Sequence, residues 1–202
     1  MKKYLTEFIG TFFLVMGAAL AGGLGAGLSL MIMVYAGGHI SGGHYNPAVT
    51  LAVWIRGRST VPEMLAYWAF QIAAAIVAAL VVANIFEFEG AGSCAVADDG
   101  IVKAVIAEII GTFALAYVVL NVATAKGTTG NSFYGLAIGG TVVTMATVIG
   151  KYSGGGYNPA VAIGLSIQKS FCWEQIWIYV LGGFAGAALA GLVFKYNNPG
   201  DK

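Results

Sequence analysis

The sequence predicts an all-α integral membrane protein with six transmembrane helices and two re-entrant half-helices, arranged as two inverted three-helix repeats. Three observations support this fold: an apolar composition, a stretch duplicated in each half, and the pentapeptide YNPAV written twice. Of the 202 residues, 58% are hydrophobic and 9% are charged. A soluble domain carries about 25% charged residues, so a soluble fold is excluded. The net charge of +1 gives no reason to expect a nucleic-acid partner.

Long gaps between charged residues define the candidate spans. A helix needs roughly 20 apolar residues to cross the hydrocarbon core of a bilayer. The first span also has the layout of a cleavable signal peptide, but Glu7 at the start of its apolar core argues against that alternative. The predicted spans cover approximately residues 4–21, 25–40, 63–85, 103–122, 131–149 and 174–194.

An internal duplication organises the chain. The stretch LTEFIGTFFLV at 5–15 matches IAEIIGTFALA at 106–116, and one YNPAV follows in each half. We therefore predict one membrane domain over 1–202, with repeat 1 at about 1–90 and repeat 2 at about 100–202. Because each repeat holds three spans, the second repeat enters the membrane with the opposite orientation.

The distribution of cations predicts the orientation. With the N-terminus in the cytoplasm, most cations fall in cytoplasmic loops and tails, as the positive-inside rule requires. This places both termini in the cytoplasm and the protein in the plasma (inner) membrane. The cations on the predicted cytoplasmic side are Lys2, Lys3, Arg56, Arg58, Lys126, Lys195 and Lys202.

The two YNPAV motifs each predict the start of a half-helix. Asn is a preferred N-cap, and Pro is favoured at the first helical position. Helices from Pro47 to Arg56 and from Pro159 to Lys169 would be roughly 15–16 Å long, about half the hydrocarbon thickness. We expect them to enter from opposite faces and meet at mid-membrane, which brings their positive dipole ends together and disfavours cations and protons there.

Glycine-rich segments precede both half-helices and must be extended at membrane depth. Such backbone is tolerated only inside protein or along a water-filled cavity. Its carbonyl oxygens and the amides of Asn46 and Asn158 would form a path for small neutral hydrogen-bonding molecules. The residues predicted to line this path with backbone carbonyls are Gly42, Gly43, His44, Gly154 and Gly156.

These features closely resemble the aquaporin, or major intrinsic protein (MIP), family over essentially the whole chain. The resemblance rests on HISGGHYNPAVT, the trailing WIRGR, the repeated TEFIGTF and AEIIGTF, and two Asn-Pro-Ala (NPA) motifs: Asn46, Pro47, Ala48 and Asn158, Pro159, Ala160. It implies six tilted helices and two half-helices around one pore per subunit, normally in a homotetramer without a cofactor. Family members conduct water, and some conduct glycerol, urea, ammonia, hydrogen peroxide or metalloid acids.

The chain departs from the family at the outer constriction, or selectivity filter. The family usually has Arg three residues after the second motif Asn, where this chain has Val161. The register carries the other filter positions onto Ala26, Ala146 and Gly155, which are small. We expect a pore wider than a strict water filter. The position usually held by Asp in the glycerol-conducting branch is Ala162, which does not favour glycerol.

The sequence therefore predicts a passive channel for water and small neutral solutes, in contact with the lipid bilayer. Three alternatives stay open: a strict water channel, a channel that leaks protons or ions because the Arg is lost, and a structural membrane protein with a closed pore. We expect no enzyme activity, because no catalytic set of residues and no nucleotide-binding motif is present in the sequence.

A few polar residues in apolar surroundings allow two readings each. Glu7 and Glu108 fit a structural role, accepting hydrogen bonds from the half-helix loops, better than a proton relay. His39 and His44 are too few for a metal site, so we expect no metal. Cys94 and Cys172 both fall on the predicted outer side, where they either pair or stay buried thiols.

Overall fold

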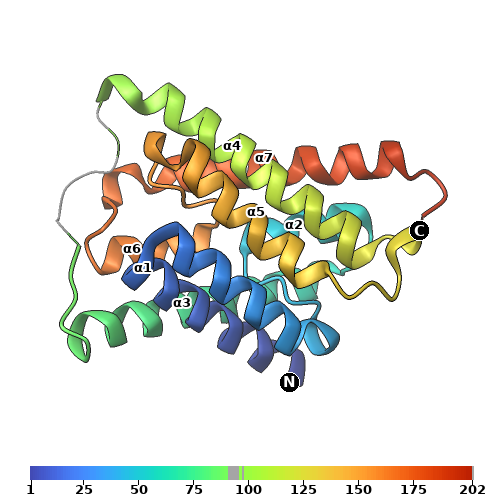
Figure 1. Ribbon diagram of the computed structural model, residues 1–202, viewed down its shortest axis with the longest axis horizontal. Coiled ribbons are helices and arrows are strands. Elements are labelled where there is room, and N and C mark those ends of the chain that lie inside the picture. The colour runs from blue at the N-terminus through green and yellow to red at the C-terminus, as the bar shows by residue number, and fades with distance from the viewer. Residues whose placement is uncertain (91–95, 97, 202) are drawn as a thin grey trace.

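The protein folds as a bundle of helices in a computed structural model that describes residues 1–90, 96 and 98–201 (Figure 1). No strand occurs within these residues. The main helices are α1 (Lys2–Ser41), α2 (Pro47–Arg56), α3 (Val61–Asn84), α4 (Ile101–Val119), α5 (Tyr134–Ile149), α6 (Pro159–Ile167) and α7 (Ile176–Asn197). Short turns connect them: η1 (Asp98–Gly100), η2 (Leu120–Thr124, a π-helical extension of α4), η3 (Lys126–Thr128), η4 (Gly150–Tyr152) and η5 (Trp173–Gln175).

Helix α1 is a hairpin of two membrane-spanning arms. Its 40 residues would reach about 60 Å as one rod, about twice the hydrocarbon thickness. Instead the backbone breaks at Ala21 and Gly22, where Gly22 adopts φ 58° and ψ −147°. A Cβ added to Gly17 would lie 2.6 Å from the carbonyl oxygen of Gly25, so the arms pack backbone to backbone. Figure 1 shows both blue arms side by side.

The break divides α1 into two arms, and this confirms the predicted number of six spans. Five helices of the described chain are long and apolar enough to cross a membrane, and α1 among them has the length of two crossings. The two short apolar helices, α2 and α6, have 10 and 9 residues, about half of a crossing. The all-α membrane fold with two half-helices is therefore correct.

The end of α6 differs from the prediction. The helix was expected to run to Lys169 but ends at Ile167. Gln168 closes it, and Lys169 adopts a left-handed φ of 68°, where the backbone cannot continue a right-handed helix. Lys169 then pairs with the exposed Glu89 at 2.8 Å. The matching helix α2 does end at its predicted cation, Arg56.

Small residues let the long helices approach closely. A Cβ added to Gly186 of α7 would lie 2.8 Å from the backbone nitrogen of Phe113 on α4, and one added to Gly182 would lie 2.6 Å from Cβ of Glu108. In a bilayer the hydrophobic effect does not drive helices together, so van der Waals contact between closely packed backbones stabilises their association instead. Gly182 and Gly186, which are four residues apart on α7, thus lie at the α4–α7 contact.

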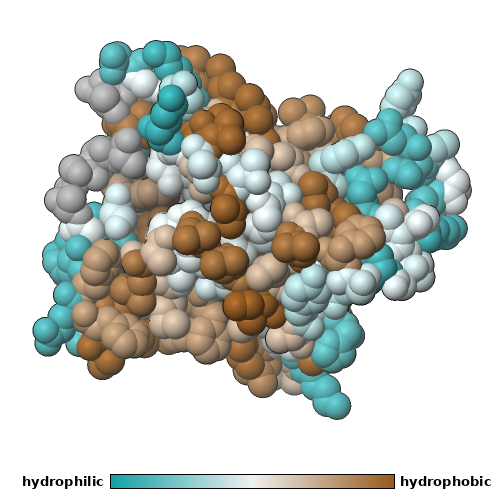
Figure 2. Space-filling view, in the orientation of Figure 1, coloured by the Kyte–Doolittle hydropathy of each residue, from teal (hydrophilic) through white to brown (hydrophobic). Residues whose placement is uncertain are grey.

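Polar residues gather at the two ends of the bundle. Figure 2 shows hydrophilic residues toward both ends of the long axis and a hydrophobic band between them. The band includes many exposed apolar side chains, among them Leu65, Leu80, Ile106 and Leu192. Such a surface matches a hydrocarbon environment rather than water.

The C-terminal tail returns to the end of α2. The guanidinium of Arg56, which is fully buried, donates to Asp201 Oδ1 at 2.7 Å and to the oxygen atoms of Thr124. The backbone N–H of Lys126 donates to Asp201 Oδ2 at 2.7 Å, and this bond, with that from Arg56, holds the pKa of Asp201 below its ordinary value. One carboxylate therefore joins the half-helix to the turn after α4.

We predict that Gly25→Val destabilises the protein, because any Cβ at this position meets the backbone of Gly17. Overpacking of this kind costs about 1–3 kcal/mol, which lowers the thermal midpoint by roughly 2–10 °C for a chain of this size. The measurement is thermal unfolding of detergent-solubilised protein. Gly140→Ala is the control, because a Cβ there meets no atom within 4 Å. Equal midpoints for the two variants would contradict the packing described for α1.

Candidate functional site: a central pore between two half-helices

The two half-helices begin with the same local geometry. Asn46 Oδ1 accepts hydrogen bonds from the backbone N–H groups of Ala48 at 2.8 Å and Val49 at 3.4 Å. Asn158 Oδ1 accepts from Ala160 at 2.9 Å and from Val161 at 3.4 Å. Each Asn is extended, and a Pro follows at the first helical position. The Asn-Pro pairs thus begin each helix as capping chemistry requires.

The same two Asn side chains tie the half-helices together. Asn46 Nδ2 donates to the carbonyl oxygen of Tyr157 at 2.9 Å, and Asn158 Nδ2 donates to the carbonyl oxygen of Tyr45 at 2.9 Å. Both side chains are buried. Each Asn therefore caps its own helix with its oxygen and holds the opposite loop with its nitrogen, which fixes the two tips against each other.

The loops before the half-helices are held by two buried carboxylates. Glu7 accepts from the backbone N–H groups of His44 at 3.0 Å and Tyr45 at 2.7 Å, and from the Ser41 hydroxyl at 2.7 Å. Glu7 and Glu108 are both fully buried. Hydrogen bonds to a carboxylate are stronger than neutral ones.

Glu108 repeats the arrangement in the second half. It accepts from the backbone N–H groups of Gly156 at 3.0 Å and Tyr157 at 2.6 Å, and from the Ser153 hydroxyl at 2.6 Å. The two carboxylates thus supply the acceptors that these loops lose by leaving helical geometry.

The first repeat carries extra polar groups that the second lacks. Gln71 Nε2 donates to Glu7 at 2.8 Å and to Thr50 Oγ1 at 3.1 Å, and His44 Nδ1 lies 3.1 Å from the same hydroxyl oxygen. The His44 ring also packs against the ring of Tyr67, with 5.0 Å between centroids. These contacts fix the position of the imidazole.

Backbone carbonyls on both approaches have no partner in the described part of the chain. Their oxygen atoms belong to Gly42, Gly43, His44, Gly154, Gly155 and Gly156. Gly42, Gly43, Gly154 and Gly155 have φ between 63° and 90°, a conformation that glycine adopts without strain. Extended backbone at this depth thus leaves a series of acceptors beside the half-helix tips.

A cavity passes beside the Asn pair. Its volume is about 50 Å³, room for about three to five water molecules. A larger vestibule of about 590 Å³ opens on the side where α2 ends. Besides Asn46 and Asn158, most of the cavity wall is apolar: Leu14, Ala18, Ala26, Leu30, Val49, Leu115, Val119, Ile138, Val142, Val161 and Leu165.

Four of the five predicted carbonyl-lining residues line the cavity or the vestibule. Gly154 and Gly156 line the cavity, Gly42 lines the vestibule, and His44 lines both. Gly43 lines neither of them, because its backbone lies against Gly38, and a Cβ added to it would be 3.3 Å from the Gly38 Cα.

Three of the four predicted filter residues line the cavity. They are Ala26, Gly155 and Val161. Ala146 does not, because its Cβ is covered by Gly23 where α1 crosses α5. Val142, one helical turn earlier on α5, faces the cavity instead. No Lys or Arg lies among the described residues of this wall.

Sequence reasoning missed most of the apolar wall and Gln71. The signal for the wall lay in the repeat itself, since Leu14 and Leu115 occupy equal positions after Glu7 and Glu108. For Gln71 we find no local signal, because its contacts with Glu7 and Thr50 join distant parts of the chain.

Other predicted residues lie away from the cavity. His39 is exposed at the vestibule. The described residues contain no group of three His, Cys, Asp or Glu that could hold a metal ion. Cys94 lies outside the described residues, so the two alternatives stated for it above, a pair with Cys172 and a buried thiol, both stay predictions.

The chain is similar to known proteins over most of its length, both in sequence and in fold. A family model described as Major intrinsic protein matches residues 1–194. Glycerol uptake facilitator protein-like 6 of Lactiplantibacillus plantarum is 36% identical, over 94% of this chain and 95% of that protein. Probable aquaporin TIP2-2 of Arabidopsis thaliana is 37% identical, over 96% of this chain and 86% of that protein. The solved aquaglyceroporin from Plasmodium falciparum superposes with a TM-score of 0.81 at 18% identity, covering 98% of this chain and 97% of that one.

We predict that Glu108→Gln lowers stability, because the amide nitrogen of Gln cannot accept and leaves at least one buried donor of the loop unpaired. Such a loss costs about 1–3 kcal/mol, or roughly 2–10 °C in thermal midpoint. Glu89→Gln is the matched control, since Glu89 and its partner Lys169 are both more than half exposed and such pairs contribute about 0–1 kcal/mol. A Glu108→Gln midpoint equal to that of the control would contradict the anchoring role.

Proposed function

The chain belongs to the major intrinsic protein family, and on that premise we propose that it conducts water and small neutral solutes passively through the central cavity. As a member of this family it is a multi-pass membrane channel for water or small solutes and not an enzyme. The observation that supports conduction through this cavity is the reciprocal bonding of Asn46 and Asn158 beside a space of about 50 Å³, which has room for a few water molecules.

The proposed path has one polar side and one apolar side. Each Asn amide has two N–H groups, and one is used on the opposite Tyr carbonyl. The second N–H is available to a solute oxygen at mid-membrane. Unpaired carbonyls on each approach offer acceptors before and after this point, while the apolar wall offers none. A small neutral molecule can therefore exchange its hydrogen bonds stepwise as it passes.

Charge is disfavoured at the same point. The N-terminal ends of α2 and α6 converge on the Asn pair, and each carries the positive end of its helix dipole. Cations and protons are repelled there, although Val161 supplies no positive charge of its own. The proposed filter of Ala26, Gly155 and Val161 is small and uncharged, and this supports passage of neutral solutes besides water.

Further parts of the proposal concern assembly and location. We infer a homotetramer in the plasma membrane with both termini in the cytoplasm. The support is the family membership, the exposed apolar band (Figure 2) and the cations near the vestibule, Arg56, Arg58 and Lys126. The inverted-repeat organisation is proposed on the matched bonds of Glu7 and Glu108.

The first test is an osmotic jump on liposomes that contain the purified protein, followed by light scattering. With sucrose outside, we expect shrinkage much faster than in protein-free liposomes. With urea outside, we expect fast shrinkage followed by reswelling, because urea enters through the pore. Fast shrinkage without reswelling would indicate a strict water channel. Shrinkage no faster than lipid alone would favour the closed-pore structural protein and contradict the proposal.

Blocking the cavity tests whether the flux uses it. We predict that Val161→Trp lowers water permeability about ten-fold or more, because the indole fills a cavity of few water molecules. Val148→Trp is the control, since Val148 is 58% exposed on α5. Equal permeability of the two variants, both eluting as intact protein, would show that water takes another route.

Proton exclusion is a separate prediction. With a pH-sensitive dye inside the same liposomes, we expect no proton flux above the lipid background under an imposed potential, because the two helix ends oppose it. A flux that appears in the unmodified protein and disappears in Val161→Trp would instead support the ion-leaky alternative.

A further inference from the structure

The cavity wall is built from matching positions of the two repeats. The Tyr45 hydroxyl donates to the Met33 carbonyl at 2.9 Å, and the Tyr157 hydroxyl donates to the Met145 carbonyl at 3.1 Å. The second arm of α1 therefore corresponds to α5, with Met33 equivalent to Met145. The first arm of α1 corresponds to α4 through Glu7 and Glu108, which make the same bonds.

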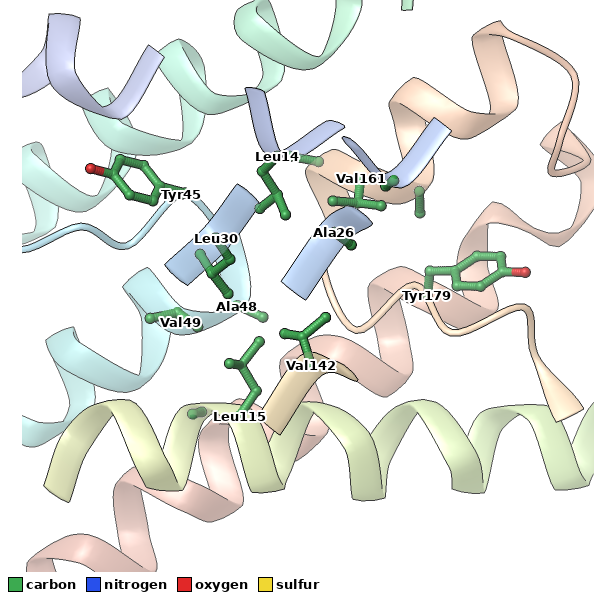
Figure 3. Packing of buried hydrophobic residues seen from close by; sticks show 14 of the residues in the cluster. Leu14, Ala26, Leu30, Tyr45, Ala48, Val49, Leu115, Val142, Val161 and Tyr179 are labelled. Carbon is green, nitrogen blue, oxygen red and sulfur yellow. The ribbon is translucent and has the colours of Figure 1, made fainter. Parts of the chain in front are cut away.

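Since the two repeats are proposed to be inverted, their matching positions are expected at equal distances on opposite sides of the midplane. Gly27 of α1 packs against Gly139 and Val143 of α5, which sets the level at which these two helices cross. Leu30 and Val142 lie close to this level, as do Leu14 and Leu115, and Figure 3 shows these four side chains directed toward a common space. Ala26 is adjacent to Gly27 and its equivalent Ile138 is adjacent to Gly139, so they lie on opposite sides of the crossing, each about one helical turn along its helix from Leu30 or Val142.

The two sides differ in the size of their side chains. We call His44, Val49, Val119 and Ile138 the vestibule-side ring. His44 and Val119 line both cavities, while Val49 and Ile138 line the central cavity one helical turn from Val53 and Tyr134, which line the vestibule. The far-side ring consists of the equivalent residues, in the same order Gly156, Val161, Ala18 and Ala26. Three of the four pairs place the larger residue in the vestibule-side ring, and the fourth is Val in both.

The boundary between the central cavity and the vestibule also lies at the vestibule-side ring, and this observation does not depend on side-chain size. His44 and Val119 line both the central cavity of about 50 Å³ and the vestibule of about 590 Å³. These two residues therefore form the neck that joins the two spaces. The neck is also held in position, because the His44 ring is fixed by Thr50 and Tyr67.

We propose that the vestibule-side ring, rather than the far-side ring that contains Val161, is the constriction that selects solutes by size in this pore. This proposal rests on the proposed function, since it concerns which solutes the channel conducts. The ring offers three apolar side chains and one imidazole. With Nδ1 of His44 engaged by Thr50, Nε2 is the nitrogen that faces a solute. Such a ring passes water and small planar neutral solutes and slows bulkier polyols.

Reciprocal substitutions test the proposal. Val119→Ala with Ile138→Ala gives the vestibule-side ring the side chains of its counterpart at two of the three positions that differ, and Ala18→Val with Ala26→Ile does the reverse. The measurement is the ratio of glycerol to water permeability in liposomes. We expect the first double variant to raise the ratio roughly ten-fold, as a change of a few methylene groups does in a tight pocket. We expect the second to lower it by at most about two-fold, because it adds in series a second constriction that is no narrower than the first.

The opposite pattern overturns the proposal. If the first double variant leaves the ratio unchanged while the second lowers it strongly, the far-side ring selects and the proposed function still stands. If the unmodified protein does not accelerate water flow, both proposals fail together. Val119→Ala alone, which removes less volume, is expected to raise the ratio in the same direction and serves if the double variant does not fold.

Discussion

Backbone N–H groups that leave helical geometry inside the membrane must find acceptors there, and the centre of this protein depends on meeting that requirement. Glu7 and Glu108 meet it for the loops, and Asn46 and Asn158 meet it for the helix ends. The donors are satisfied on the side away from the cavity, which leaves carbonyl acceptors unpaired. The polar side of the pore is thus a result of the way in which the loops are anchored.

The remaining architecture positions these anchors. Glu7 lies on the first arm of α1 and Glu108 on α4, and each needs a helix partner close enough to exclude lipid from the carboxylate. Gly182 of α7 allows this at Glu108, because any Cβ there would overlap the Glu108 side chain. Asn46 and Asn158 then hold the two half-helices against each other. The positions of the N-terminal ends of α2 and α6 are therefore fixed by four side chains: Glu7, Glu108, Asn46 and Asn158.

How much of this was predictable depends on whether the cause is local. The starts of α2 and α6 were predicted correctly, because an Asn-Pro cap is a property of adjacent residues. The membrane spans were also predicted correctly, because the length of an apolar segment is likewise a property of neighbouring residues in the sequence. The wall residue on α5 was not, because the rotation of that helix is set by the contact of Ala146 with Gly23, more than a hundred positions away in sequence. The end of α6 also failed, since a left-handed Lys169 has no sequence signal.

The two-residue break in α1 has a consequence for how the chain enters the bilayer. The two arms contact each other through Gly17 and Gly25, and Gly37 lies against Thr6 near their other ends. Residues 2–41 can therefore insert as one helical hairpin, whose arm-to-arm contacts need no later segment of the chain. Glu7 is then carried into the membrane before its backbone donors at His44 and Tyr45 arrive. Within the first helix pair the carboxyl group has only the Ser41 hydroxyl as a donor, and the backbone donors of the following loop favour a loop that turns inward rather than one that leaves the membrane.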